Sequence, residues 1–355
     1  MSHRLFLAVA FALLVLAGGC RETPAAERVA SARGARATPG PVVVEEARLD
    51  AVYTRADSLS RLRSLLVFHA DTLRRERYFH GARAEQPANI KSASKSVISA
   101  LVGIALARGH LRDVRQPLSE LLPAETRGLD TAHRAITVED LLTMRSGLQS
   151  TSFDQYGAFV SSRNWVRHAL TRPVVAPRGE AGPMIYGTGS THILSAVLTR
   201  ATKQSTWAFG RSALAPLGIR LRSWTTDPQG VYFGGNEMRM TTREMLAFGR
   251  LYLDGGRAPD GSQLLPRAWI DSSWVARTTS GWSGNAYGYG WWIRQAHGHP
   301  VYFAWGYGGQ FIFVVPSASM VVVATSDPTP ERRDGAHLGA VHDLVDELLA
   351  PADSP

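Results

Sequence analysis

The residues with the clearest chemical potential are Ser92 and Lys95, which lie three positions apart in the tetrapeptide Ser-Ala-Ser-Lys. In a helix this spacing puts the serine hydroxyl and the lysine amine on the same face, one turn apart. A serine hydroxyl is a poor nucleophile at neutral pH and needs an adjacent base. A lysine amine can be that base only if desolvation or a neighbouring cation keeps it neutral. The pair therefore indicates attack on a carbonyl carbon and a covalent acyl-enzyme.

A helix over residues 92–108 is predicted to position this pair, with Asn89 as a suitable cap upstream and Gly109 as its end. The N-terminus of a helix supplies backbone N–H groups and partial positive charge where an oxyanion would form. The apolar residues that would desolvate the lysine are Val97, Ile98, Leu101, Val102 and Ile104. Because Ser-x-x-Lys is short enough to occur by chance, the rest of the sequence must decide its meaning.

The segment around this pair resembles a known family. Residues 89–103 are similar to the nucleophile segment of the class C β-lactamase-related serine hydrolases, which include penicillin-binding DD-peptidases, esterases and 6-aminohexanoate-dimer hydrolases. Three later segments, at 136–147, 216–219 and 240–245, resemble further landmarks of the family in the same order. The resemblance extends over about residues 64–347. It implies the β-lactamase/transpeptidase-like fold, with Ser92 as the nucleophile.

The second motif of the family, Tyr-x-Asn, corresponds by resemblance to Tyr186-Gly-Thr188. The resemblance implies that the Tyr186 phenol accepts the Ser92 proton, or relays a proton to the leaving group, if cationic Lys95 lowers the phenol pKa from about 10. Thr188 replaces the asparagine, which affects recognition of a substrate amide rather than acylation. The sequence leaves open whether Lys95 or Tyr186 is the base, because a coupled pair titrates jointly.

The third motif, Lys-Thr-Gly, is replaced here by Tyr307-Gly308-Gly309, followed by Gln310. Without the lysine, the site lacks a cation for the carboxylate of penicillins or peptides, which favours neutral esters or amides as substrates. The glycines permit close approach of the backbone to a ligand. By resemblance, the N–H of Gln310 joins that of Ser92 in an oxyanion hole. The expected oxyanion and substrate-binding residues are Thr188, Tyr307, Gly308, Gly309 and Gln310.

The order of strand and helix patterns predicts an α+β fold. Two apolar-patterned runs flank Asp71-Thr72 and predict a hairpin over residues 64–80. The segments between about 111 and 225 are mostly helical, and the last third of the chain is rich in aromatic and β-branched residues. The predicted helices are 137–144, 163–170, 191–201, 205–214 and 337–349, and the predicted strands are 287–293, 301–305, 310–316 and 320–325. Strands at both ends predict an antiparallel sheet built from N- and C-terminal strands, with flanking helices and an inserted helical region.

The first residues are typical of an export signal. Arg4 precedes an apolar run, residues 5–17, which is too short to span a bilayer but suits a signal-peptide core. The run ends at Cys20, the single cysteine, in a segment that resembles a bacterial lipoprotein signal; ordinary cleavage is the alternative, because the leucine lies one place too early. We predict a signal peptide at 1–19, a flexible tether at 20–48 and a hydrolase domain at 49–350. The expected location is the bacterial cell envelope, anchored to the lipid bilayer through lipidated Cys20, or secretion without lipidation.

Composition and motifs argue against several other classes. The formal net charge is +9, but the arginines are scattered and form no basic stripe, so no nucleic-acid partner is expected. His297-Gly-His299 lacks a third ligand at helical spacing and is interpreted as a turn, so no metal is expected. No dinucleotide-binding fingerprint is complete, and no cofactor is expected. His192 and Glu139 are interpreted as structural. Most tryptophans are expected in the core, with one or two near Tyr307 bordering the site.

The sequence thus predicts a serine hydrolase that cleaves a small-molecule ester, amide or peptide-like substrate through an acyl-enzyme on Ser92. Two alternatives remain open at this stage. One is a β-lactamase or DD-peptidase, and the other is a non-catalytic ligand-binding or sensor protein on the same fold, since two of the three motifs depart from the family pattern. The natural substrate and the oligomeric state are not determined by the sequence.

Overall fold

A computed structural model describes residues 42–329 and 335–351. The predicted signal peptide, Cys20 and the tether as far as residue 41 lie outside the described residues. Helix α2 begins at Glu46, so the last three residues of the predicted tether, 46–48, are helical and belong to the folded domain. Among the described residues, none of the helices combines the length and the apolar character needed to cross a bilayer.

The central element is an antiparallel sheet of eight strands in the order β2-β1-β10-β9-β8-β7-β6-β5. Its strands are β1 (Leu62–His69), β2 (Thr72–Tyr78), β5 (Thr278–Thr279), β6 (Ala286–Tyr287), β7 (Trp292–Ala296), β8 (His299–Gly306), β9 (Gln310–Val315) and β10 (Met320–Ser326). The N-terminal hairpin joins the C-terminal strands because β1 pairs with β10. A two-stranded sheet of β3 (Ala88–Asn89) and β4 (Arg239–Met240) lies apart from it. The predicted sheet built from both ends of the chain is confirmed.

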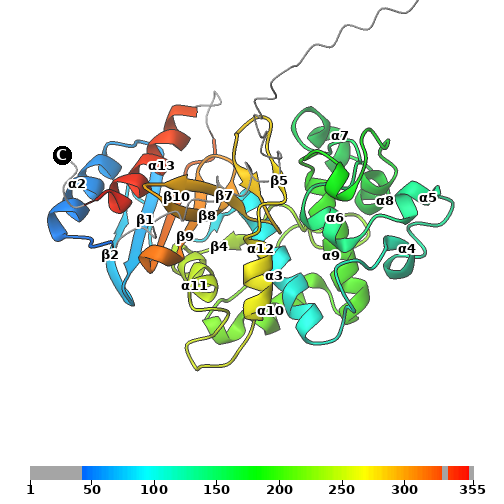
Figure 1. The fold of residues 1–355 in the computed structure, drawn as a ribbon, viewed down its shortest axis with the longest axis horizontal. Helices are drawn as coiled ribbons and strands as arrows, with labels where there is room; N and C mark the ends of the chain where they lie inside the picture. Colours follow the sequence, from blue (N-terminus) through cyan, green and yellow to red (C-terminus); the bar gives the residue numbers. More distant parts are fainter. Residues whose placement is uncertain (1–41, 330–334, 352–355) are drawn as a thin grey trace, which may run out of the picture. The chain divides into compact units, whose positions relative to one another are not determined.

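Helices cover the sheet and form a separate region between its two halves in sequence (Figure 1). They are α2 (Glu46–Asp57), α3 (Ser94–Ala107), α4 (Leu118–Leu121), α5 (Thr131–Arg134), α6 (Val138–Leu142), α7 (Tyr156–Val160), α8 (Trp165–Leu170), α9 (Thr188–Thr202), α10 (Thr206–Leu214), α11 (Thr242–Leu253), α12 (Arg267–Ser273) and α13 (Gly335–Leu349). Short 3-10 turns are η1 (Lys91–Ala93), η2 (Phe153–Gln155), η3 (Gly179–Ala181), η4 (Ala215–Leu217) and η5 (Pro316–Ala318). Helices α2 and α13 pack together, and α11 packs on β1, β9 and β10.

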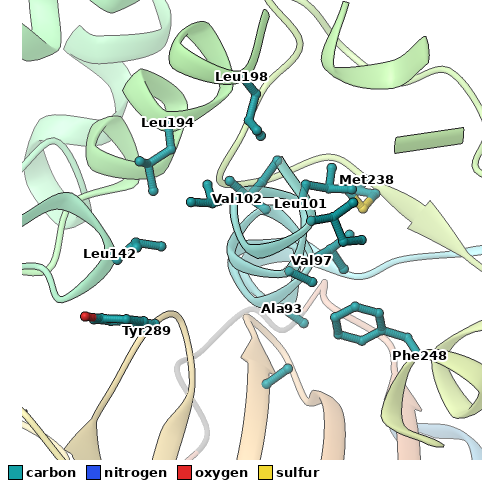
Figure 2. Packing of buried hydrophobic residues seen from close by; sticks show 14 of the residues in the cluster. Ala93, Val97, Leu101, Val102, Leu142, Leu194, Leu198, Met238, Phe248 and Tyr289 are labelled. Carbon is teal, nitrogen blue, oxygen red and sulfur yellow. The ribbon is translucent and has the colours of Figure 1, made fainter. Parts of the chain in front are cut away.

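Helix α3 lies between the sheet and the helical region, in contact with both α9 and β8. A helix that is apolar on nearly all sides is stable only when it is buried, and residues 94–105 of α3 are buried. Figure 2 shows Val97, Leu101 and Val102 of α3 among side chains from the surrounding elements. These neighbours are Leu142, Leu194, Leu198, Met238, Phe248 and Tyr289. The N-terminal end of α3, which carries Lys95, is thereby held in a rigid position.

The predicted elements agree with the structure except at a few boundaries. The predicted strand 287–293 is divided, because residues 288–291 turn between β6 and β7. Gly290 has a φ of 75°, which lies outside the extended conformation. A Cβ on Gly288 would lie 2.0 Å from the Ser273 carbonyl oxygen, so only glycine fits at this position. The His297–Gly298 turn joins β7 to β8, whereas His299 is buried and hydrogen-bonds Ser317 through Nδ1.

Candidate active site

Ser92 lies in the 3-10 turn η1, immediately before α3, rather than in the first α-helical turn predicted from the sequence. Lys91 has a left-handed φ of 52°, and its backbone N–H donates to the Asn89 side-chain oxygen at 3.0 Å. Asn89 therefore does not cap the α-helix as predicted; it holds the backbone just before Ser92, and the N-cap positions of η1 and α3 are Ile90 and Ala93. The Ser92 side chain remains half-buried, so that a ligand can reach its hydroxyl.

The Lys95 amine contacts the Ser92 hydroxyl directly. Lys95 Nζ lies 3.0 Å from Ser92 Oγ and donates a second hydrogen bond of 2.8 Å to the Gly235 carbonyl oxygen. Lys95 is only 2% exposed, and burial lowers the pKa of its amine from 10.5 to about 7. Desolvation disfavours the charged amine, and the neutral form has a lone pair that can accept the Ser92 proton. The contact predicted from the Ser-x-x-Lys spacing is present.

Tyr186 comes to the same place from the loop before α9. Lys95 Nζ lies 5.0 Å from the centre of the Tyr186 ring, and the Ser92 side chain is close enough to the phenol to influence its pKa. Burial raises the pKa of Tyr186 to about 12, and the neighbouring Ser92 side chain only partly opposes this effect. The sequence-based condition that cationic Lys95 lowers the phenol pKa is thus wrong in direction. A phenol with this pKa is neutral at physiological pH, so Tyr186 has a proton to donate.

Thr188, expected to bind substrate, makes internal contacts at the start of α9. Its hydroxyl lies 2.8 Å from Ser152 Oγ, and its backbone N–H donates to the same oxygen at 2.9 Å. The residue is 4% exposed. The Thr188 side chain is therefore nearly inaccessible and already paired with Ser152. Thr188 therefore fixes the start of α9 behind Tyr186.

The turn that replaces the third motif lies between β8 and β9, next to the residues before Ser92. A Cβ on Gly306 would lie 2.1 Å from the Ile90 carbonyl oxygen, so only glycine lets β8 approach this closely. Gly308 and Gly309 have φ values of 81° and 102°, and a Cβ on either would lie within 3 Å of its neighbours. Both conformation and space therefore require glycine in this turn, because the chain's own neighbouring segments lie close to it; the predicted close approach to a ligand stays a prediction.

Gln310 contributes its backbone rather than its side chain to this region. The side chain is fully buried, donates to the Ser326 carbonyl oxygen at 2.7 Å and accepts from the Ser326 N–H at 3.3 Å. Ser326 Oγ in turn lies 2.9 Å from His337 Nε2. These contacts hold the first residue of β9 in place; the oxyanion role of its N–H stays a prediction from the sequence.

Two cations near the site are engaged in other contacts. Lys91 pairs with Glu237 at 3.2 Å, and Glu237 also accepts from the Asn89 side chain. Arg61 lies behind the β8–β9 turn and donates to the carbonyl oxygens of Gly308 and Asp327. Tyr307, at the position of the family's lysine, is 52% exposed and brings no charge.

Aromatic side chains line the surface beside Tyr186. Trp282 is 53% exposed and lies 6.4 Å, between ring centres, from Tyr186 and 5.1 Å from Trp305. The prediction that one or two tryptophans border the site is therefore consistent with the positions of Trp282 and Trp305. Trp224, Trp291 and Trp292 are buried, as expected for tryptophans of the core.

Sequence reasoning missed two participants in the site. Phe153, 49% exposed, lies 6.1 Å from the Tyr186 ring. Gly235 supplies the carbonyl that holds Lys95. The only local signal for Gly235 is the pair Gly234-Gly235, and a Cβ on Gly235 would lie 2.5 Å from Thr191 Oγ1. Phe153 has no local signal at all.

The residues interpreted as structural make internal contacts. His192 and Asp227 form a fully buried pair at 3.1 Å, and Asp227 also accepts from the backbone of its own loop. Glu139 accepts from the Tyr289 hydroxyl and pairs with Arg277. Within residues 42–329 and 335–351, no group of three or more His, Cys, Asp or Glu side chains is arranged to hold a metal ion.

The chain is similar in sequence and in fold to known proteins of one family. The Beta-lactamase family model matches residues 63–346. A 6-aminohexanoate-dimer hydrolase of Paenarthrobacter ureafaciens is 27% identical over 328 residues, which cover 84% of this chain and 81% of that protein. The class C beta lactamase of Rhodobacter sphaeroides has a TM-score of 0.64 at 16% identity and covers 86% of this chain and 100% of its own. A penicillin binding protein of Bacillus halodurans has a TM-score of 0.64 at 15% sequence identity, and the match covers 83% of this chain and 98% of that protein. The predicted β-lactamase/transpeptidase-like fold is confirmed.

Proposed function

The chain belongs to the Beta-lactamase family, and from this premise we propose that it is a serine hydrolase that cleaves an ester or amide bond through an acyl-enzyme on Ser92. The observation that carries the proposal is the 3.0 Å contact between Ser92 Oγ and Lys95 Nζ, together with the burial that brings the pKa of Lys95 to about 7. An amine with this pKa is substantially neutral at physiological pH and can act as a general base.

Acylation begins when Lys95 Nζ accepts the hydroxyl proton as Ser92 Oγ bonds to the carbonyl carbon. The resulting tetrahedral intermediate carries a negative oxygen. The backbone N–H groups of Ser92 and Gln310 are proposed to donate to this oxygen, and one such donor typically contributes about 3 kcal/mol to transition-state stabilisation. Lys95, now protonated, remains held by the Gly235 carbonyl.

Collapse of the intermediate breaks the bond between the carbonyl carbon and the leaving oxygen or nitrogen. The leaving atom takes a proton from the neutral Tyr186 phenol, and Lys95 returns its proton to Tyr186. This route is supported by the position of Tyr186, whose ring centre lies 5.0 Å from Lys95 Nζ, and by the pKa of about 12, which keeps the phenol protonated. Water then attacks the acyl-enzyme with Lys95 again as base, which releases the acid and regenerates Ser92.

The charges around the site favour a neutral substrate over a carboxylate-bearing one. Tyr307 stands where the family has a lysine, Lys91 is neutralised by Glu237, and Arg61 donates to backbone oxygens behind the turn. A substrate carboxylate entering this site would lose hydration without gaining an unpaired cation. We therefore propose esters or amides without a recognition carboxylate as the substrate class, ahead of penicillins and D-alanyl peptides.

The test is intact-mass spectrometry of the protein mixed with a panel of activated esters, amides and β-lactams, sampled over time. We expect an adduct of the mass of the acyl group on Ser92, located by peptide mapping, that forms and then decays as acid is released. An adduct that forms and persists with every compound would instead identify a ligand-binding or sensor protein. Rapid turnover of nitrocefin at ordinary enzyme concentration, with slow turnover of esters, would identify a β-lactamase.

We further propose that the protein is a lipoprotein of the bacterial cell envelope. The support is the sequence alone: Arg4, the apolar run 5–17 and the small residues before Cys20. A single acyl chain gives only marginal membrane binding, so stable anchoring requires the multiple chains of a lipoprotein. In a bacterial host, the wild-type chain should partition into the detergent phase, and Cys20→Ser should be released as a soluble protein. A wild-type chain that is soluble after export would contradict lipidation.

A further inference from the structure

Two exposed aromatic side chains stand beside the reacting groups. Phe153 and Trp282 are 49% and 53% exposed, and their ring centres lie 6.1 Å apart. Each also lies within 6.4 Å of the Tyr186 ring. Large apolar side chains that gather at one exposed place commonly mark a binding surface, because scattered ones are normal but clustered ones lose free energy in water.

Trp282 is fixed by the residues beneath it. It lies in the loop between β5 and β6, and its ring contacts the buried Trp292 at 5.5 Å and the half-buried Trp305 at 5.1 Å. Its backbone N–H donates to Ser280 Oγ at 3.4 Å. An indole held by other rings loses little conformational entropy when a ligand packs on it, so this side chain is already arranged for binding.

Phe153 is held in an unfavourable backbone conformation. Its φ is 55°, in the left-handed region that glycine and asparagine tolerate and that a bulky residue rarely adopts. Residues in such conformations cluster at functional sites, where the surrounding structure maintains them. Burial in the core does not explain a phenylalanine at this position, because the ring is half exposed to solvent.

The position of the two rings relative to Tyr186 identifies the part of the substrate they would meet. In the proposed mechanism, the Tyr186 phenol gives its proton to the leaving oxygen or nitrogen, so the group attached to that atom lies against Tyr186. We propose that Phe153 and Trp282 form a binding surface for the leaving group and that this surface selects apolar, preferably aromatic, alcohols or amines. This inference rests on the proposed function and specifies its substrate class.

The experiment compares two acetate esters that share the acyl group and differ in the leaving alcohol: 2-phenylethyl acetate and 2-methoxyethyl acetate. The ratio of their kcat/KM values reports the contribution of the leaving-group surface. We expect the wild-type protein to have the higher kcat/KM for the phenyl ester. Phe153→Ala and Trp282→Ala should each lower the ratio of phenyl ester to methoxy ester about five- to tenfold, because each variant loses one aromatic contact. Trp282→Phe should retain most of the preference. The matched control is Val275→Ala, which removes another half-exposed apolar side chain, outside the ring cluster.

A second variant separates binding from folding. Phe153→Gly removes the ring and relieves the left-handed strain, so we expect an unchanged or slightly raised Tm together with the same loss of ratio. A fall of Tm with an unchanged ratio would make Phe153 a structural residue and overturn the inference. If the variants change the sedimentation of the protein but leave the ratio of the two kcat/KM values unchanged, the surface is a contact between copies of the chain. This result would also overturn the inference. If wild type hydrolyses neither ester and Ser92 resists a fluorophosphonate probe, the proposed function itself has failed.

Discussion

Replacing Ser92 by alanine is expected to lower kcat for any ester that the protein turns over by about 10^5- to 10^6-fold, because no other group can form the acyl-enzyme. The acyl adduct in intact-mass spectra should disappear at the same time. The fold should be unaffected, since Ser92 is half-buried in a short turn and its side chain supports no core packing. Stopped-flow or endpoint hydrolysis of an activated ester measures the first effect, and thermal unfolding the second.

Ser94→Ala is the matched control for this prediction. Ser94 lies two residues further on, is fully buried, and its hydroxyl has no hydrogen-bond partner among the described residues. Replacing an unpartnered buried hydroxyl by hydrogen is expected to be neutral or slightly stabilising, with activity within about twofold of wild type. An adduct that persists in Ser92→Ala and maps to another serine would place the nucleophile elsewhere and remove the basis of the mechanism.

The local part of the site could be predicted from the sequence because helical geometry fixes it. Ser92 and Lys95 meet as the three-residue spacing requires, although the serine lies in a 3-10 turn and not in the α-helix. The sheet was likewise predictable in outline, since alternating and β-branched runs occur at both ends of the chain. The position of Tyr186, 91 residues after Lys95, depends on tertiary structure, and only the family resemblance indicated it.

The electrostatic properties of the site could not be obtained from the sequence. The pKa of Lys95 depends on burial by elements from distant segments, and its second partner is a backbone carbonyl, which has no sequence signature. Burial by distant segments also raises the pKa of Tyr186, the opposite direction to the change at Lys95. Thr188 was expected to face the substrate because the family's asparagine does, but Ser152 occupies its hydroxyl. Phe153 was overlooked because exposure and backbone strain are properties of the folded chain.

Lys95→Met is expected to lower kcat/KM by about 10^4-fold, because methionine fills a similar volume but cannot accept the Ser92 proton. The variant should be at least as stable as wild type at pH 7. Burial of the lysine lowers its pKa from 10.5 to about 7, so the folded state binds fewer protons than the unfolded state between these values. The destabilisation from lysine burial is therefore largest below pH 7 and disappears as the pH rises through 10.5. The Tm advantage of Lys95→Met should shrink over the same interval.

The same titration sets the pH dependence of catalysis in the wild-type protein. Only neutral Lys95 accepts the Ser92 proton, and the neutral fraction grows as the pH rises through about 7. We expect kcat/KM for a neutral ester to be about tenfold lower at pH 6 than on a plateau above pH 8. Tyr186 should not limit this range, since its pKa of about 12 keeps the phenol protonated throughout. If kcat/KM instead rose only through pH 10, Lys95 would titrate as an ordinary lysine, the buried amine would be cationic at neutral pH, and another group would have to deprotonate Ser92.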